Sequence, residues 1–214
     1  VFTSRWLSDA KLKFSKRNCL AAQKGKDYLK GDPLRQDILE QAIMWKTGSK
    51  NAEDIEKYMA HQKQTGAQNA DELWLYFSGV IDWVKAKFIK YRKEMKGLEW
   101  GFLYNKFKDK TLDARELEER ILQLMRDSEV GKKAGIYEYV LSGDEKFLNL
   151  RTFDDEVKRE IYEKQGGICP HCGQKFEIEQ MDADHITPWS KGGKTVRENC
   201  QMLCAECNRK KGNR

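Results

Sequence analysis

Apolar residues recur at steps of three and four over much of the first 150 residues, which predicts amphipathic helices. The capping-box spacing of Asn69-Ala70-Asp71-Glu72 predicts the start of one long helix. The buried face of this helix is expected to be a single stripe, made of Leu73, Phe77, Val80, Ile81, Val84 and Phe88.

Two further helix starts are marked by capping residues. Asp32-Pro33 is expected to open a helix that runs through Trp45 and stops near Gly48. Asp113-Ala114-Arg115-Glu116 is expected to cap another, whose stripe is Leu117, Ile121, Leu124 and Met125. Residues 1–150 therefore predict a helical domain.

Three aromatic residues of the long helix, Trp74, Tyr76 and Trp83, fall outside its apolar stripe. They are candidates for platforms on which nucleic-acid bases stack. Aromatic residues at helical spacing more often belong to a core, and this interpretation is favoured. The helix is then expected to be covered on more than one side.

The remaining residues, 151–214, predict a small second domain. Thr152 is expected to cap a helix over residues 154–165, which ends at Gly166-Gly167. Short strands are expected around residues 181–185 and 200–203, joined by a loop that contains Gly192-Gly193. A last helix is expected from about Cys204, so the fold class is mainly α.

Composition limits the function only loosely. Charged residues make up 35% of the chain and the net charge is +6, which suits either a polyanionic partner or a well-solvated helical surface. The basic residues that follow Asn208 favour the first interpretation, because they adjoin the candidate site described below. The chain has no apolar run of membrane-spanning length and no signal peptide, and it begins without Met, which indicates a fragment.

Cysteine spacing gives the strongest chemical signal. Cys169 and Cys172 form one Cys-x-x-Cys pair, and Cys204 and Cys207 form a second after 31 intervening residues. Four thiolates at this spacing predict one tetrahedral zinc, with Cys204 and Cys207 placed at i and i+3 on the last helix. Two disulfides or free thiols are the alternatives. Metal is favoured in a chain without a signal peptide, which points to the reducing cytoplasm.

A complete set of four sulfur ligands leaves the zinc no open position, so this zinc is expected to be structural. A small domain with little core is often stabilised by such a metal. His171 lies between two ligands and is expected to be a surface loop residue. Cys19 and Cys200 have no such partner and are expected to be small buried residues.

The pair Asp184-His185 is the candidate reactive site. It offers a hard oxygen ligand for Mg²⁺ and a base that titrates near neutral pH. Neighbours in a regular strand point to opposite faces, so the two share a site only if the strand twists out beyond His185. Asn208 could supply a second metal ligand, and Asn199 could orient His185 or pin the loop. Each asparagine could equally be a cap or turn residue.

Asp184-His185, Asn199 and Asn208, framed by the two Cys-x-x-Cys pairs, resemble the HNH (ββα-metal) endonucleases over residues 153–214. The third signature position is often His, where this chain has Asn208. The resemblance implies metal-dependent phosphodiester hydrolysis with His185 as general base, oriented by Asn199. Asp184 and Asn208 would hold Mg²⁺ or Mn²⁺. Phosphate contacts would come from basic residues: Lys194, Arg209, Lys210 and Lys211.

A second resemblance concerns the helical part. Residues 26–35 and 135–140 look similar to the middle of GmrSD-type phage-restriction proteins. In that family a ParB-like domain precedes the helical region, so such a domain of the same protein is an expected partner alongside DNA. The implied role is antiphage restriction. Cutting both strands requires either two successive nicks or two subunits, so a homo-oligomer is one alternative.

Two competing functions remain open. A non-catalytic zinc-knuckle module would bind nucleic acid or protein but would not require Asp184, His185 and Asn208 together. A secreted nuclease toxin of the colicin kind would require a dedicated immunity partner, and the absence of a signal peptide argues against it.

Overall fold

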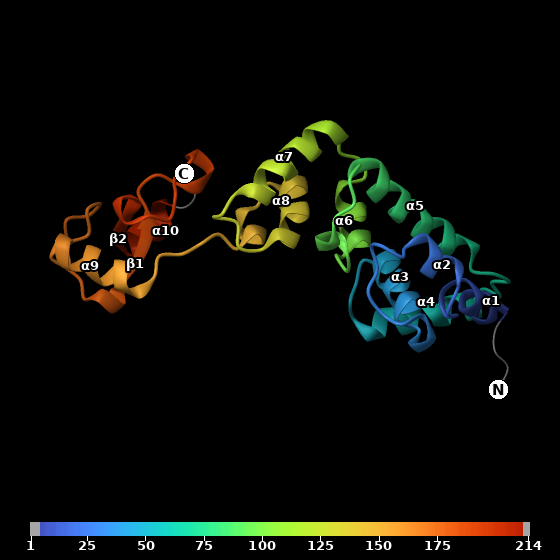
Figure 1. Ribbon diagram of the computed structural model, residues 1–214. Coiled ribbons are helices and arrows are strands. Elements are labelled where there is room, and N and C mark those ends of the chain that lie inside the picture. Colours follow the sequence, from blue (N-terminus) through green and yellow to red (C-terminus); the bar gives the residue numbers. More distant parts are fainter. Residues whose placement is uncertain (1–4, 212–214) are drawn as a thin grey trace. The chain divides into compact units, whose positions relative to one another are not determined.

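The computed structural model describes residues 5–211 (Figure 1). Contacts divide the chain into two compact units. The helical unit comprises Val1–Arg126 and Lys133–Leu148, and the C-terminal unit comprises Asp127–Lys132 and Asn149–Arg214. Residues 127–132, which the sequence placed in the helical domain, therefore lie in the C-terminal unit.

The expected fold class, mainly helical with a small C-terminal ββα unit, is confirmed. The α-helices of the helical unit are α1 (Arg5–Phe14), α2 (Leu20–Lys24), α3 (Asp37–Thr47), α4 (Ala52–Gln64), α5 (Asp71–Lys87), α6 (Trp100–Phe107), α7 (Ala114–Arg126) and α8 (Ile136–Ser142). Short 3₁₀ turns are η1 (Pro33–Arg35), η2 (Lys93–Met95), η3 (Lys133–Gly135) and η4 (Glu145–Leu148).

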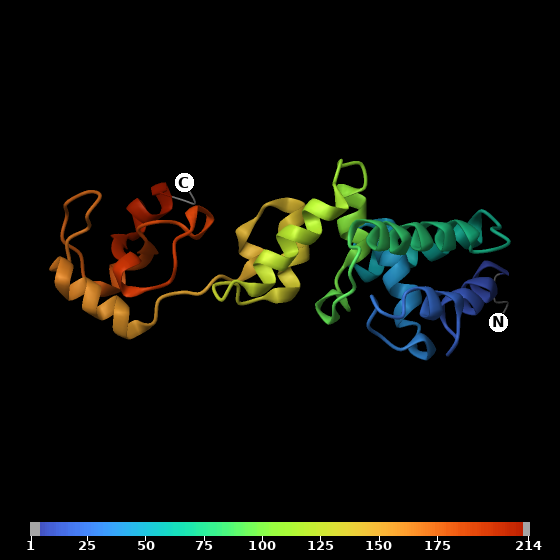
Figure 2. The same cartoon turned by 45° about the horizontal axis from the view of Figure 1, so that its top comes forward.

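Helix α5 organises the helical unit, and it lies against α2, α3 and α6 (Figure 2). Its predicted stripe is buried throughout, from Leu73 to Phe88. Trp74 also packs on Phe14, and Trp83 packs on Tyr104 at a centroid distance of 5.8 Å. The off-stripe aromatic residues thus have contacts within the unit, in line with the expectation that this helix is covered on more than one side.

The helix expected from Asp32 through Trp45 is interrupted. Asp32 accepts a hydrogen bond from the Leu34 N–H, but it caps only the short turn η1. Gln36 then adopts a left-handed conformation (φ 65°), which an α-helix does not tolerate, and α3 begins at Asp37. Gly48 ends α3 as expected.

The C-terminal unit is built on two antiparallel strands, β1 (Met181–His185) and β2 (Cys200–Cys204). Helices α9 (Asp155–Gln165) and α10 (Ala205–Lys211) pack on this sheet. Three short 3₁₀ turns, η5 (Ile178–Gln180), η6 (Trp189–Lys191) and η7 (Arg197–Asn199), complete it. A core with Phe153, Ile161, Met202 and Leu203 joins the helices to the sheet.

Two local expectations are corrected here. Asp154, rather than Thr152, caps α9, because its carboxylate accepts a hydrogen bond from the Val157 N–H. Cys204 is the last residue of β2 and not part of the final helix, which begins at Ala205. The side chain of Gln165, at the end of α9, pairs with the backbone N–H and C=O of Met202 and thereby satisfies the free edge of β2.

Candidate active site and metal centre

The four predicted cysteine ligands come together in the C-terminal unit. Their sulfur atoms all lie within 4.8 Å of one another. The Cys172 and Cys204 sulfurs are 4.0 Å apart, close to the separation of about 3.8 Å that a tetrahedral zinc with Zn–S bonds of about 2.3 Å requires. The cluster therefore fits one zinc ion with four sulfur ligands.

The ionisation of these thiols also favours a cation. Burial alone would raise the pKa of Cys169, but hydrogen bonds from the backbone N–H groups of Cys204, Cys172 and His171 lower it to about 6. A hydrogen bond with the Cys204 thiol and burial raise the pKa of Cys207 to about 12. Cys169 thus forms a thiolate readily and Cys207 does not, and a cation bound among the sulfur atoms would favour the thiolate at both positions.

The other cysteines and His171 lie where they were expected. Cys19 and Cys200 are buried, and burial raises the pKa of Cys200 to about 11, so its thiol is unreactive. His171 is exposed on the knuckle between Cys169 and Cys172.

His185 ends β1 and is held on two sides. Its Nε2 lies 2.9 Å from the Thr195 hydroxyl, and its ring packs on Phe153 at a centroid distance of 4.5 Å. Burial lowers the pKa of His185, although the carboxylates of Asp184 and Glu129 act in the opposite direction. The lowered pKa favours the neutral imidazole, the form that a general base requires.

The hydrogen bonds of Thr195 indicate which ring nitrogen of His185 can accept a proton. The Thr195 hydroxyl carries a single hydrogen, and it lies 3.3 Å from the Arg151 carbonyl, which can only accept. When Thr195 donates this hydrogen to Arg151, it accepts from a protonated Nε2 of His185. In this tautomer the lone pair of Nδ1 is available to take a proton.

Residues 127–132 fix the loop that carries Thr195. Glu129 is almost fully buried, and its carboxylate accepts a hydrogen bond from the Thr195 N–H at 3.0 Å. Asp127 accepts from the Trp189 indole at 2.9 Å and pairs with Lys194 at 3.0 Å. Neither acid was predicted from the sequence, because nothing in its local pattern links residues 127–132 to a loop some 60 residues later.

An oxygen-rich cluster lies on β1 beside α10. The Asp184 carboxylate accepts hydrogen bonds from Gln201 and Lys211, and the Lys211 ammonium also contacts the His185 carbonyl. The Asn208 amide donates to Asp182 at 3.1 Å, and not to Asp184. Asp182 and Asp184 are two residues apart on one strand and so share a face.

This cluster fits a hard divalent cation. Carboxylates of Asp182 and Asp184, the Asn208 amide and a backbone carbonyl are oxygen donors of the kind that Mg²⁺ and Mn²⁺ prefer. The Lys211 ammonium contacts both the Asp184 carboxylate and the His185 carbonyl oxygen, so these two oxygens can bind one cation together. Asp182 was not among the predicted ligands.

Asn199 pins the loop, one of the two roles expected for it. Its amide exchanges two hydrogen bonds with the backbone of Thr187 and donates a third to the Lys194 carbonyl. The same loop passes so close to Gly193 that an added Cβ would lie 1.8 Å from the Thr187 carbonyl oxygen. Glycine is therefore required there, and Asn199 acts on His185 only through the loop.

Three of the four predicted phosphate-binding cations are already engaged within the unit. Lys194 pairs with Asp127, Lys210 pairs with Glu206, and Lys211 contacts Asp184. Arg209 is exposed on α10. Their role in binding DNA stays a prediction.

Comparison with known proteins identifies the family to which this part of the chain is similar. Residues 169–214, which contain the four cysteines, Asp184-His185, Asn199 and Asn208, match the family HNH endonuclease. They form an HNH endonuclease domain. The resemblance inferred from the sequence is thus confirmed for this region, whereas the GmrSD-type resemblance of the helical part stays a prediction.

Two curated relatives share the HNH region. A type IV methyl-directed restriction enzyme, EcoKMcrA of Escherichia coli (strain K12), is 31% identical over 71 residues, 30% of this chain and 26% of the relative. A CRISPR-associated endonuclease Cas9 of Corynebacterium diphtheriae is 36% identical over 52 residues, 24% of this chain and 5% of the relative. The chain thus spans about a quarter of the first relative's length.

No solved structure matches the chain. Within residues 5–211, none of the helices has the length and apolar composition needed to cross a bilayer. The HNH match begins at residue 169, so Glu129, Asp127 and Phe153, which contact the candidate site, lie outside the matched region.

Proposed function

We propose that the chain is a metal-dependent endonuclease that hydrolyses phosphodiester bonds in DNA. The observation that carries this proposal is the His185 imidazole, which contacts the Thr195 hydroxyl and belongs to the residue directly after Asp184 of the oxygen-rich cluster. A protein that only binds nucleic acid needs neither a histidine base nor an oxygen-rich cluster.

His185 acts as the general base. Its Nδ1 takes a proton from the water that attacks the scissile phosphorus, while Nε2 stays bonded to the Thr195 hydroxyl. Glu129 and Asn199 hold the loop that presents Thr195, so they position the base and do not react themselves. The protonated imidazole that results is stabilised by the nearby carboxylates of Asp184 and Glu129.

Asp184 and Asn208 would hold Mg²⁺ or Mn²⁺, together with Asp182, the carboxylate to which the Asn208 amide donates. The bound ion supplies charge neutralisation at the phosphate and at the leaving oxygen. Because the Lys211 ammonium contacts Asp184 and the His185 carbonyl, a bound ion would displace it from these oxygens, and it could then contact the same phosphate. The four-cysteine zinc keeps α10, and hence Asn208, in register with the sheet.

The biological setting is inferred from the relatives. One is named a methyl-directed restriction enzyme and the other a CRISPR-associated endonuclease, and both names support DNA as the substrate. Together with the GmrSD-type resemblance of the helical part, they support a role in antiphage restriction in the cytoplasm. A ParB-like domain of the same protein and self-association remain predictions.

Cleavage of supercoiled plasmid tests the proposal. Protein that holds its zinc but has been freed of other divalent ions is given Mg²⁺ or Mn²⁺. The wild type is compared with Asp184→Ala and Asn208→Ala. Nicked or linear plasmid is expected only with added metal, and each substitution should raise the metal concentration needed for half-maximal cleavage. A folded, zinc-loaded wild type that never cuts would instead support a binding module built on the zinc knuckle.

A further inference from the structure

Positive charge is distributed very unevenly along this chain. Residues 24–30 and 85–96 together hold nine lysines and arginines but only two acidic residues. The C-terminal unit, by contrast, has thirteen basic and thirteen acidic residues and therefore no net charge. The net charge of +6 of the whole chain thus comes from the helical unit.

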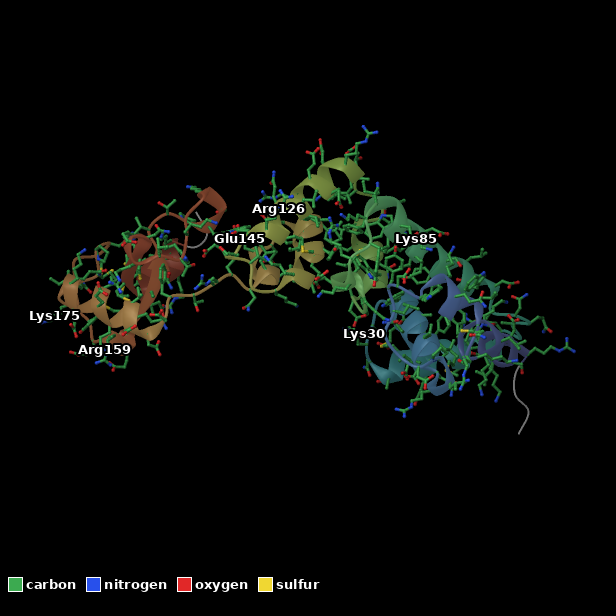
Figure 3. All side chains as sticks on the ribbon, in the orientation of Figure 1. Lys30, Lys85, Arg126, Glu145, Arg159 and Lys175 are labelled. Atoms are coloured by element: carbon green, nitrogen blue, oxygen red, sulfur yellow. The ribbon has the colours of Figure 1, made fainter. Side chains whose placement is uncertain are left out.

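The two basic segments lie side by side in the helical unit. The rings of Tyr28 and Tyr91 pack edge to face at a centroid distance of 5.9 Å. The Gly97 N–H donates to the Tyr28 carbonyl at 2.8 Å, and the Lys85 ammonium reaches the Lys24 carbonyl at 3.4 Å. The segments thus form one surface, called here the basic surface, from which Figure 3 labels Lys30 and Lys85.

Most cations of the basic surface have no internal counter-charge. Lys24 pairs with Asp82, and Arg92 pairs with Glu118. Six other lysines are exposed, and within residues 5–211 none of them forms an ion pair with a carboxylate: Lys26, Lys30, Lys85, Lys90, Lys93 and Lys96. In the HNH domain, by contrast, three of the four residues predicted to bind phosphate, Lys194, Lys210 and Lys211, are engaged with carboxylates.

Six uncompensated ammonium groups on one surface repel one another, so a polyanion that neutralises them binds favourably. Lysine ammonium groups are point charges on flexible stems, which suit a row of phosphates without selecting a base sequence. Exposed apolar residues on the surface are few, with Ile89 and Tyr91 the largest, and no amphipathic helix with a broad apolar face accompanies them to insert into a lipid bilayer.

We infer that the basic surface of the helical unit binds the phosphate backbone of duplex DNA and supplies most of the protein's affinity for its substrate. The inference rests on the proposed function, because a nuclease whose C-terminal unit has no net charge needs an electrostatic anchor elsewhere in the chain. Binding through this surface is independent of sequence and sensitive to salt, and it leaves the HNH domain to contact only the phosphates at the cut.

The test measures binding without cleavage. The full chain carrying His185→Ala is titrated into a fluorescein-labelled DNA duplex, without added divalent metal, and anisotropy is recorded over a range of salt concentrations. The cluster variant adds Lys26→Gln, Lys90→Gln and Lys93→Gln. The control variant instead adds substitutions of three exposed lysines elsewhere in the helical unit, Lys11→Gln, Lys16→Gln and Lys63→Gln, and has the same net charge.

The cluster variant is expected to bind at least about tenfold more weakly at moderate salt, with a salt slope lower by about 3. The control variant should bind like its parent, and all variants should hold equal zinc and melt alike. Equal losses in both variants, or an unchanged cluster variant, would overturn the inference. Tighter binding to anionic lipid vesicles, or to single strands, than to the duplex would also overturn it. A wild type that binds DNA through this surface but never cuts contradicts the proposed function alone.

Discussion

The carboxylate of Glu129 accepts a hydrogen bond from the backbone N–H of Thr195 at 3.0 Å, although 66 residues separate the two along the chain. Thr195 in turn contacts Nε2 of His185 at 2.9 Å. The imidazole is thus positioned, through Thr195, by a buried acid that belongs to the segment Asp127–Lys132 and lies outside the HNH region.

Replacing Glu129 by Ala should therefore slow cleavage without removing the base. The Thr195 N–H loses its buried partner and the loop shifts, so the single-turnover rate should fall by about 10- to 100-fold. Glu129→Gln should retain most of the rate, because its amide oxygen still accepts from the same N–H. Both variants should keep the affinity of the wild type for DNA.

The matched control for this prediction is Glu163→Ala, at an exposed position on α9. It should cleave like the wild type. If Glu129→Ala and Glu163→Ala have the same rate while both hold zinc, Glu129 does not position His185.

The lowered pKa of Asp127 predicts that the folded protein loses stability in acid. Burial alone would raise the pKa of Asp127, but hydrogen bonds from the Glu129 N–H, Lys194 and Trp189 lower it below its usual range. The folded state then binds the proton more weakly than the unfolded state does. The stabilisation is complete above the unfolded pKa of about 4 and disappears as the pH falls through the lower folded value.

Thermal unfolding midpoints of wild type and Asp127→Asn, measured from pH 7 to about pH 3, check this. The wild type should melt higher at neutral pH, and the difference should shrink below about pH 4. A difference that stays constant over this range would show that the Asp127 charge contributes nothing.

Removal of zinc should unfold the C-terminal unit and spare the helical unit. A structural zinc contributes on the order of 10 kcal/mol to the folding of a small domain, and the core of this unit is small. Cys169→Ser should lose zinc, and the tertiary structure of the C-terminal unit with it, while most of the helical circular dichroism signal remains. Bound zinc per chain, measured by elemental analysis, should be one for the wild type.

Cys200→Ala is the control for the zinc prediction, since Cys200 lies in the same core but belongs to no Cys-x-x-Cys pair. It should bind zinc normally. A Cys169→Ser protein that keeps both its zinc and its fold would contradict the assignment of Cys169 as a ligand.

Local signals in the sequence predicted the elements well. The stripe from Leu73 to Phe88 and the strand at Met181–His185 follow from periodicity and from turn residues, which act over a few positions. The break at Gln36 was not predicted, because a left-handed glutamine has no signature in sequence. The role of Cys204 as a strand residue was likewise hidden by the helical spacing of Cys204 and Cys207.

The site was predicted only where its residues are close in sequence or match a motif. The zinc ligands carry such a spacing. Other contacts depend on how distant segments pack. They are the contact of Asn208 with Asp182 and those of Glu129 and Asp127 with the loop that carries Thr195. Such contacts are set by tertiary structure and produce no periodic pattern in the sequence.

The central claim is that His185 is the base of a metal-dependent nuclease. Its most direct test is the single-turnover rate of plasmid cleavage by wild type and His185→Ala at saturating Mn²⁺, with equal zinc content and equal DNA affinity. The account predicts that His185→Ala cleaves at least about 100-fold more slowly. An equal rate for the two proteins would contradict it.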